Sequence, residues 1–474
     1  MRLMLSILLP VISALMLAGP ARSDLLPDEQ RLLAGVNIGR MMSTLERLCS
    51  DEFQGRRAGS AEHYLAADYI ASEFQSAGLA ELRSDAMEGY KQPLTMRYSL
   101  IKSKNEITAT LSYPSGASWK TERFSYSNYN GAGGLDLDTE VVFVGHGIHE
   151  PESGYDDYHG IDVKGKIVLW LPGQPTGVKL TKGSTAVRKM VTAYQHGAVA
   201  CLICRPSGVG DEWGTNIGLA GAIADFPYLA VDEKIGSELL GASDIARRPP
   251  KVGAVGSQVK LTVTPVCDPA RKTYNVVSMI PGESDEIVMV GAHYDHLGAS
   301  AGGEIFHGAD DNASGVTVML EIARIIRESG LTPRRTMVFA AWTGEEAGLI
   351  GSNYFAANPP FALKRIVSNL EFDMVGQGKP GCFVTTGAAS YPDHHLHIDT
   401  SAADLGILIK AEKYPGASDY LAFTRKGVPS SLIYADGEHP NYHTVRDTPA
   451  GIDRRVLESA ARLGVLSAWR AANR

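Results

Sequence analysis

One stretch, residues 286–315, constrains the fold of this 474-residue chain more than any other. Its apolar run 287–290 predicts a buried strand, and the strand ends in the polar sequence His-Tyr-Asp-His at 293–296. After a glycine-rich turn, two acids at 310 and 311 precede an apolar helical segment, 316–326. Ligands and catalytic groups collect at the carboxyl ends of strands in open α/β sheets, so this stretch is a candidate metal site. Taken alone it has a second interpretation, because acids also cap helices and a histidine beside an acid can be a structural pair.

The strands that follow also run into histidines or carboxylates. They are predicted at 336–341, 366–372 and 431–434. Together with the first strand they supply five candidate metal ligands, which are His293, Asp311, Glu346, Asp373 and His443. Two imidazoles and three carboxylates suit Zn²⁺. Two such ions, about 3.5–4 Å apart, repel each other and therefore need a shared carboxylate between them.

The alternation of strands and helices after residue 270 predicts an α/β fold. We expect a mainly parallel mixed sheet with helices on both faces, including helices at 316–328 and 453–472. Helical spacing of apolar residues also predicts helices at 24–48 and 61–77. With 474 residues, the chain exceeds what one core usually covers, which indicates two or three domains.

Residues 132–265 have a different pattern. A Gly-Lys-Ile-Val-Leu strand, a helix at 184–196 and a second strand at 198–203 resemble the protease-associated domain, a small β-rich module inserted into several peptidase families. We therefore expect a catalytic domain formed by 24–131 and 266–474, interrupted by the insert 132–265. The insert carries no cluster of histidines and acids, so we assign it no chemistry. Cys201 and Cys204 lie in its predicted core strand and are expected to be buried structural thiols.

The first 23 residues have the organisation of a secretory signal peptide. Arg2 is followed by an apolar segment, 3–17, and the sequence Ala-Arg-Ser at 21–23 fits the cleavage pattern. We expect a secreted or periplasmic protein without stable membrane insertion after signal removal. An uncleaved anchor is the alternative, but the apolar segment is short for a membrane span. A net charge of −8 without a basic run argues against nucleic acid as a partner.

The chain contains, in this order, the motifs His-x-Asp at 293–295, Asp-Asp-Asn-Ala-Ser-Gly at 310–315, Glu-Glu-x-Gly-Leu-x-Gly-Ser at 345–352, Asp-Met at 373–374 and His-Thr-x-x-Asp-Thr at 443–448. Their order and wording resemble the di-zinc aminopeptidase family. This family includes secreted bacterial leucyl aminopeptidases and shares its zinc aminopeptidase/phosphorylase-hydrolase-like fold with the transferrin receptor and glutamate carboxypeptidase ectodomains. The resemblance covers residues 40–85 and 270–474 and implies two Zn²⁺ per chain. It makes Asp311 the bridging ligand, with His293 and Asp373 on one ion and Glu346 and His443 on the other.

By the same resemblance, the chain is a secreted metallo-aminopeptidase that removes N-terminal residues from peptides with a zinc-activated water. Glu345 matches the general base, and Asp295 matches the acid that orients His293. Tyr442 adjoins a ligand, and its hydroxyl either steadies the tetrahedral intermediate or only packs. The residue preference and the oligomeric state are not determined by the sequence.

Other polar residues near these motifs receive structural interpretations. His296, His307 and His439 flank the motifs and could support the metal ligands from behind, but surface or capping roles are expected for them. The sequence His-His-Leu-His at 394–397 is expected to form a solvated turn or helix start. Asp419 is expected to support the site without binding metal.

Three alternative functions stay open. A carboxypeptidase, a dipeptidase or another amidohydrolase could use the same di-zinc core, because Arg425, Lys426 and Arg446 lie near the site motifs and could bind a substrate carboxylate. A glutaminyl-cyclase-like reaction needs only one zinc. A non-catalytic binding ectodomain is the third alternative, and the intact ligand set argues against it. No Gly-x-Ser-x-Gly and no His-Glu-x-x-His motif is present, which argues against a serine hydrolase and a helix-type single-zinc protease.

Overall fold

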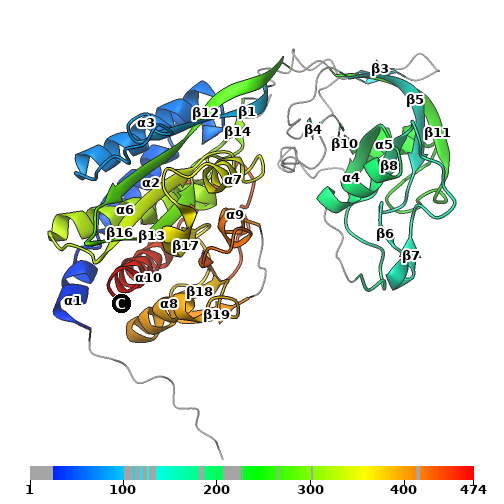
Figure 1. Cartoon of the computed structure of the whole chain (residues 1–474). Helices are drawn as coiled ribbons and strands as arrows, with labels where there is room; N and C mark the ends of the chain where they lie inside the picture. Colours follow the sequence, from blue (N-terminus) through cyan, green and yellow to red (C-terminus); the bar gives the residue numbers. More distant parts are fainter. Residues whose placement is uncertain are drawn as a thin grey trace, which may run out of the picture.

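The computed structural model describes residues 25–100, 110–112, 118–119, 125–126, 135–180, 186–205, 226, 228–263, 266–299, 303–412 and 417–474. These residues form two α/β parts, each built on an eight-stranded sheet (Figure 1). The predicted signal peptide lies outside the described residues. In the part of the chain that the structure describes, no helix is both long enough and apolar enough to span a bilayer.

The first sheet has the strand order β1-β12-β16-β13-β17-β20-β18-β19. Its strands are β1 Lys91–Leu100, β12 Val266–Ile280, β13 Ser284–His293, β16 Arg335–Trp342, β17 Ile366–Phe372, β18 Cys382–Thr385, β19 Leu408–Ala411 and β20 Ser430–Ala435. The four central strands, β16, β13, β17 and β20, are parallel, whereas β12 and β18 run antiparallel to their neighbours β16 and β20. The predicted mixed, mainly parallel sheet is confirmed, and the carboxyl ends of its central strands lie along one edge.

Helices cover both faces of this sheet, as expected. The helices of this part are α1 Pro27–Ala34, α2 Ile38–Leu48, α3 Ala61–Ser76, α6 Gly315–Ser329, α7 Ile350–Ala357, α8 Pro392–Leu405, α9 Tyr420–Thr424 and α10 Arg454–Asn473. Val288 and Val290 of β13 pack in the core formed with α2, α3, α6 and α10. Ile287 and Met289 of the same strand pack on the other face, with Phe355 of α7 and Phe423 of α9. Burial on both faces explains the unbroken apolar run of this strand.

The single helix expected at 24–48 is wrong, because the chain breaks it after Ala34. The side chain of Asn37 accepts a hydrogen bond from the main-chain N–H of Arg40 at 3.0 Å and begins a new helix, α2. Asparagine is a preferred residue at a helix start because it satisfies a free main-chain donor. Apolar spacing continued across the break and concealed it.

The second part contains the sheet β3-β2-β11-β5-β8-β9-β10-β4. Its elements are β2 Thr110–Ser112, β3 Ser118–Trp119, β4 Ser125–Tyr126, β5 Leu135–Phe143, β8 Ile167–Trp170, α4 Ala186–Gln195, β9 Ala200–Arg205, β10 Tyr228–Asp232, α5 Glu233–Leu239 and β11 Val255–Val263. Small hairpins form from β6 His149–Glu150 with β7 Tyr155–Asp156 and, near the first sheet, from β14 Gly298–Ala299 with β15 Ile305–Phe306. Cys201 and Cys204 are buried in β9, in agreement with the structural role expected for them.

The N-terminal boundary predicted for the insert, residue 132, is wrong. Strand β2 pairs with β11, and β4 pairs with β10, so this sheet already begins near residue 110. The alternating pattern of 85–130 predicts strands but does not reveal which sheet they join. On the C-terminal side, β11 of the second sheet ends at Val263, and β12 begins its pairing with β1 at Val266. The boundary at residue 265 stays a prediction.

A buried ion-pair cluster ties the last helix to the first part of the chain. Arg470 of α10 lies 2.8 Å from Glu29 of α1 and 2.6 Å from Asp404 of α8. All three side chains are at most 4% exposed. Removal of the guanidinium would leave both buried carboxylates without their buried cation, and Glu29 would keep only the half-exposed Arg474 as a cationic neighbour, at 3.2 Å.

We expect Arg470→Ala to lower the free energy of unfolding by about 3–5 kcal/mol, because breaking a buried ion pair strands the remaining charge. Urea denaturation followed by circular dichroism measures the change. Arg455→Ala is the control, since Arg455 lies in the first turn of the same helix and pairs with Asp453 at the surface. Equal losses for the two variants would contradict the assigned role of Arg470.

Candidate metal centre

A pocket of about 400 Å³ lies at the edge of the first sheet where its parallel strands end. It is lined by Asp311, Glu345, Asp373, Met374, Ala417, Leu432, Tyr434, His439, Tyr442 and His443. Most of these residues lie in the segments that follow the parallel strands β13, β16, β17 and β20. The pocket therefore lies where ligands bind in open α/β sheets.

The five residues predicted as metal ligands converge here in two groups that share Asp311. In one group, His293 Nε2 lies 3.3 Å from Asp311 Oδ1 and 3.3 Å from Asp373 Oδ1. In the other, His443 Nε2 lies 2.8 Å from Asp311 Oδ2 and 3.2 Å from Glu346 Oε1. Asp311 thus presents one oxygen to each group, which is the arrangement of a bridging carboxylate.

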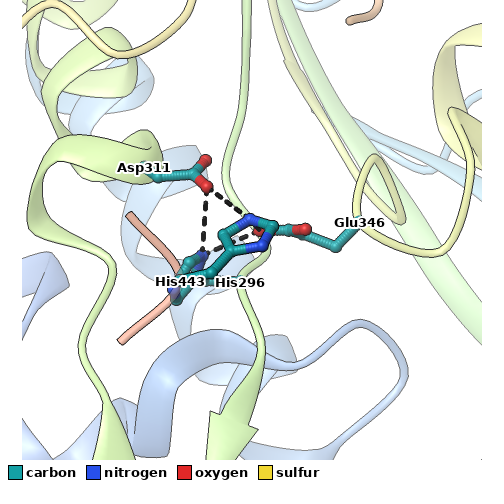
Figure 2. A group of neighbouring side chains, drawn as sticks. All are labelled: His296, Asp311, Glu346 and His443. Atoms are coloured by element: carbon teal, nitrogen blue, oxygen red, sulfur yellow. Dashed lines mark hydrogen bonds and ion pairs between the residues drawn. The ribbon is translucent and has the colours of Figure 1, made fainter. Parts of the chain in front are cut away.

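His296 joins the second group, and the surface or capping role expected for it is wrong. Its side chain is buried, and its Nδ1 lies 2.9 Å from Glu346 Oε1 and 3.8 Å from Asp311 Oδ2 (Figure 2). The turn after β13 brings it back toward the site, three residues beyond His293. The sequence does contain one signal for this role, because His296 follows the strand that ends in His293 by only one short turn. The direction in which its side chain points depends on that turn, which the sequence does not reveal.

Asp295 contacts its neighbours through other atoms than we expected. The Nδ1 of His293 lies 3.2 Å from the main-chain carbonyl of Asp295 and 3.8 Å from its carboxylate. The carboxylate instead accepts the main-chain N–H groups of Glu345 at 3.1 Å and Glu346 at 3.4 Å. Asp295 therefore orients His293 with its carbonyl, which leaves Nε2 free to ligate, and holds the Glu345–Glu346 turn with its side chain.

Glu345 and Glu346 diverge as expected for adjacent residues. Glu345 lines the pocket, whereas Glu346 points to His296 and His443. Burial, followed by the charges of Glu346, Asp419 and Asp373, raises the pKa of Glu345 well above its usual range. A carboxylate at the pocket wall that holds a proton more firmly than usual suits a general base.

The charges of the second group are tightly coupled. Burial lowers the pKa of His443, but the charges of Glu346 and Asp311 outweigh it and raise that pKa to about 10. Conversely, burial raises the pKa of Glu346, but the charge of His443 and its contact with His296 lower it to about 2. The carboxylates therefore attract positive charge strongly and favour the protonated form of His443, whereas burial lowers the pKa of His296.

Both groups fit zinc in donor type and in spacing. Zinc takes imidazole nitrogen and carboxylate oxygen at about 2.0–2.2 Å, so neighbouring donors of a tetrahedral site lie about 3.3 Å apart. The separations of 2.8–3.3 Å between His293, Asp311 and Asp373 and between His443, Asp311 and Glu346 agree with this spacing. Ligation itself stays a prediction for all five residues.

A second set of carboxylates holds the segments that carry the groups. Asp447 accepts the main-chain N–H groups of Asp310 at 2.9 Å and Asp311 at 3.1 Å. Asp310 in turn accepts the N–H groups of Gly376 at 2.8 Å and Gln377 at 3.0 Å. We call Asp310, Asp447 and the main-chain groups that they bind the frame of the site. From the sequence, Asp310 and Asp447 were recognised as motif residues only, and this supporting role was not predicted.

His439 is part of this frame, so the surface or capping role expected for it is also wrong. Its Nδ1 lies 2.5 Å from Asp310 Oδ2, and its Nε2 lies 3.0 Å from the carbonyl of Ala435. Both ring nitrogens face acceptors, which favours the doubly protonated ring. In contrast, His307 is half-buried and bonds the carbonyl of Cys49 at 2.7 Å, away from both groups.

The histidines at 394–397 begin helix α8, but they are not solvated as expected. His394 and His395 are buried, and His394 bridges the hydroxyls of Ser368 and Ser431, each at 2.9 Å. Neither belongs to a candidate metal group among the described residues. Asp419 is buried and also lies outside both candidate groups of the described residues, and its supporting role stays a prediction.

Tyr442 lines the pocket and is 50% exposed. Its ring stacks on that of His443, with ring centroids 3.7 Å apart and an angle of 20° between the planes. Packing against His443 is therefore one role of Tyr442. A role of its hydroxyl in catalysis stays a prediction.

Comparison with known proteins supports the identity of this part of the chain. Residues 275–466 match the family model described as Peptidase family M28. An aminopeptidase of Pseudomonas aeruginosa is 27% identical over 441 residues, which cover 86% of this chain and 72% of the relative. A probable lipoprotein aminopeptidase, LpqL, of Mycobacterium tuberculosis is 30% identical over 347 residues. That alignment covers 65% of this chain and 62% of the relative, less than two thirds of its length.

The fold is also found in a solved structure, a zinc aminopeptidase from Bacillus subtilis. It matches with a TM-score of 0.65 and 22% identity, and the match covers 92% of this chain and 96% of that one. The matched family segment contains both candidate metal groups, the pocket and the frame around Asp310. On these grounds, residues 275–466 of the chain are similar to peptidase family M28.

Proposed function

We propose that the protein is a metallo-aminopeptidase that binds two Zn²⁺ and removes N-terminal residues from peptides. The observation that carries this proposal is the position of Asp311, whose two oxygens face two separate groups of ligand-type side chains. Glu345 stands beside them in the pocket wall, where a base is needed. The names of the relatives support the peptide substrate, and the solved zinc aminopeptidase supports the metal.

In this proposal His293 and Asp373 would hold one ion, Glu346 and His443 would hold the other, and Asp311 would contribute to both. When bound, the ions lower the pKa of a water molecule and polarise the scissile carbonyl. Glu345 accepts a proton from the attacking water and then donates it to the leaving amine. The carboxylate of Asp295 accepts the main-chain N–H of Glu345 at 3.1 Å and so keeps Glu345 in place.

The lining of the pocket favours an aminopeptidase over a carboxypeptidase. Three carboxylates, those of Asp311, Glu345 and Asp373, face the pocket, and no lysine or arginine is among the described residues that line it. With Asp311 and Asp373 bound to Zn²⁺, the lining still offers no cationic side chain for the carboxylate of a peptide. Arg425, Lys426 and Arg446, which motivated the alternative, are all exposed and line no part of this pocket.

From the segment 1–23 we also infer export from the cytoplasm.

The purified protein should release the aniline from aminoacyl anilides and leave N-acylated analogues intact. Removal of metal with a chelator should abolish turnover. Added Zn²⁺ should restore turnover, which should rise until about two ions per chain are bound and then stay constant. Absorbance assays combined with metal analysis by mass spectrometry measure both. Hydrolysis of N-acylated substrates at equal rates would contradict the aminopeptidase assignment.

Glu345→Gln and Glu346→Gln should separate the base from the ligand. The first substitution keeps the shape of the side chain, but an amide accepts no proton, so we expect kcat to fall by about 10²–10⁴ while both ions stay bound. Glu346→Gln should instead weaken one ion, and excess Zn²⁺ should restore part of its activity. Metal analysis and turnover of both variants measure these effects. If Glu345→Gln loses zinc and Glu346→Gln keeps it, the two roles are exchanged.

A further inference from the structure

We propose that His296 is a direct ligand of one of the two ions, so that this ion is enclosed by four protein side chains and the other by three. The four are His296, Asp311, Glu346 and His443 (Figure 2). The inference rests on the two-ion centre proposed above. It adds a ligand that the motif resemblance does not supply, and it gives the two ions different roles.

The spacing of the four donors carries the proposal. His296 Nδ1 lies 2.9 Å from Glu346 Oε1 and 3.8 Å from Asp311 Oδ2. His443 Nε2 lies 2.8 Å from the same oxygen of Asp311 and 3.2 Å from that of Glu346. The four separations scatter around the edge of about 3.3 Å expected between donors of tetrahedral zinc. The two imidazoles thus occupy equivalent positions with respect to the two carboxylates.

The ring of His296 is fixed before any ion binds. Its side chain is fully buried, and a Cβ at Gly308 would lie only 2.5 Å from its Cγ, so the ring packs directly on the main chain of Gly308. The Nδ1 atom faces the other three donors, whereas the buried Nε2 has no hydrogen-bond partner in the described residues. A buried histidine with one nitrogen among three donors matches a ligand better than a surface or capping residue.

The other group offers three protein donors, His293, Asp311 and Asp373. Structural zinc sites are closed by four protein ligands, whereas catalytic sites have three and keep a position for water or substrate. Asp311, Asp373, Glu345 and His443 line the pocket, but His293, His296 and Glu346 do not. The four-donor ion therefore stabilises Asp311 and the charge of the centre, and the three-donor ion keeps the position for water.

Zinc titration of three forms of the full chain tests the proposal. The metal-free wild type, His296→Gln and His296→Ala are titrated with Zn²⁺ against a chromophoric chelator, and bound metal is counted by mass spectrometry. We expect the wild type to bind two ions. Both variants should bind one of them at least about 100-fold more weakly, beyond the 10–100-fold typical of residues that only orient a ligand.

The glutamine variant distinguishes a ligand from a tether, because its amide can still donate a hydrogen bond to Glu346. If His296→Gln binds both ions as the wild type does, His296 is a tether or has no role, and the proposal is overturned. His307→Gln is the matched control, since His307 is close in sequence but lies outside both groups, and it should keep both ions. A wild type that binds only one ion would refute the two-ion centre itself.

A measurement on the wild type makes the test independent of variant folding. X-ray absorption at the zinc edge of the fully loaded protein counts imidazole ligands. We expect three imidazole ligands in total for the two ions, one from His293 on the first ion and two from His296 and His443 on the second. A total of two imidazole ligands would overturn the proposal even if the variants lost metal through misfolding.

Discussion

The bridging position of Asp311 is the constraint on which the rest of the site depends. Its Oδ1 lies 3.3 Å from His293 and its Oδ2 lies 2.8 Å from His443, so one carboxylate must serve partners from two distant segments. Such placement is unfavourable unless positive charge accompanies it, because several carboxylates are buried together. The imidazoles supply part of that charge, and bound cations would supply the rest.

The surrounding structure holds this carboxylate by its main chain. Asp447 accepts the N–H groups of Asp310 and Asp311, and Asp310 binds the segment after β17 and His439. On the other side, the buried guanidinium of Arg56 donates to the carbonyls of Tyr294, Leu48, His307 and Gly308. Loops that would otherwise move are thereby fixed relative to one another, which is what a preorganised ligand set requires.

The elements that position the site could be predicted because their signals are local. The apolar runs at β13, β16 and β17 and the acids and histidines after them are adjacent in sequence, so strand ends and candidate ligands were found together. The features that were missed depend on direction or on distant partners. Whether His296 points inward is decided by the turn after β13, and whether β2 joins the first or the second sheet is decided by its pairing with β11.

The sequence by itself determined the class of fold, the parallel strands and the five candidate ligand residues that gather at their ends, since periodicity and motif order are properties of short segments. Only the tertiary structure decided which atoms meet. It placed the carbonyl rather than the carboxylate of Asp295 on His293, assigned one oxygen of Asp311 to each group and brought His296 and His439 inward. The physical reason is that hydrogen bonds and ligand contacts form only when atoms from segments far apart in the chain are positioned to within a few tenths of an ångström.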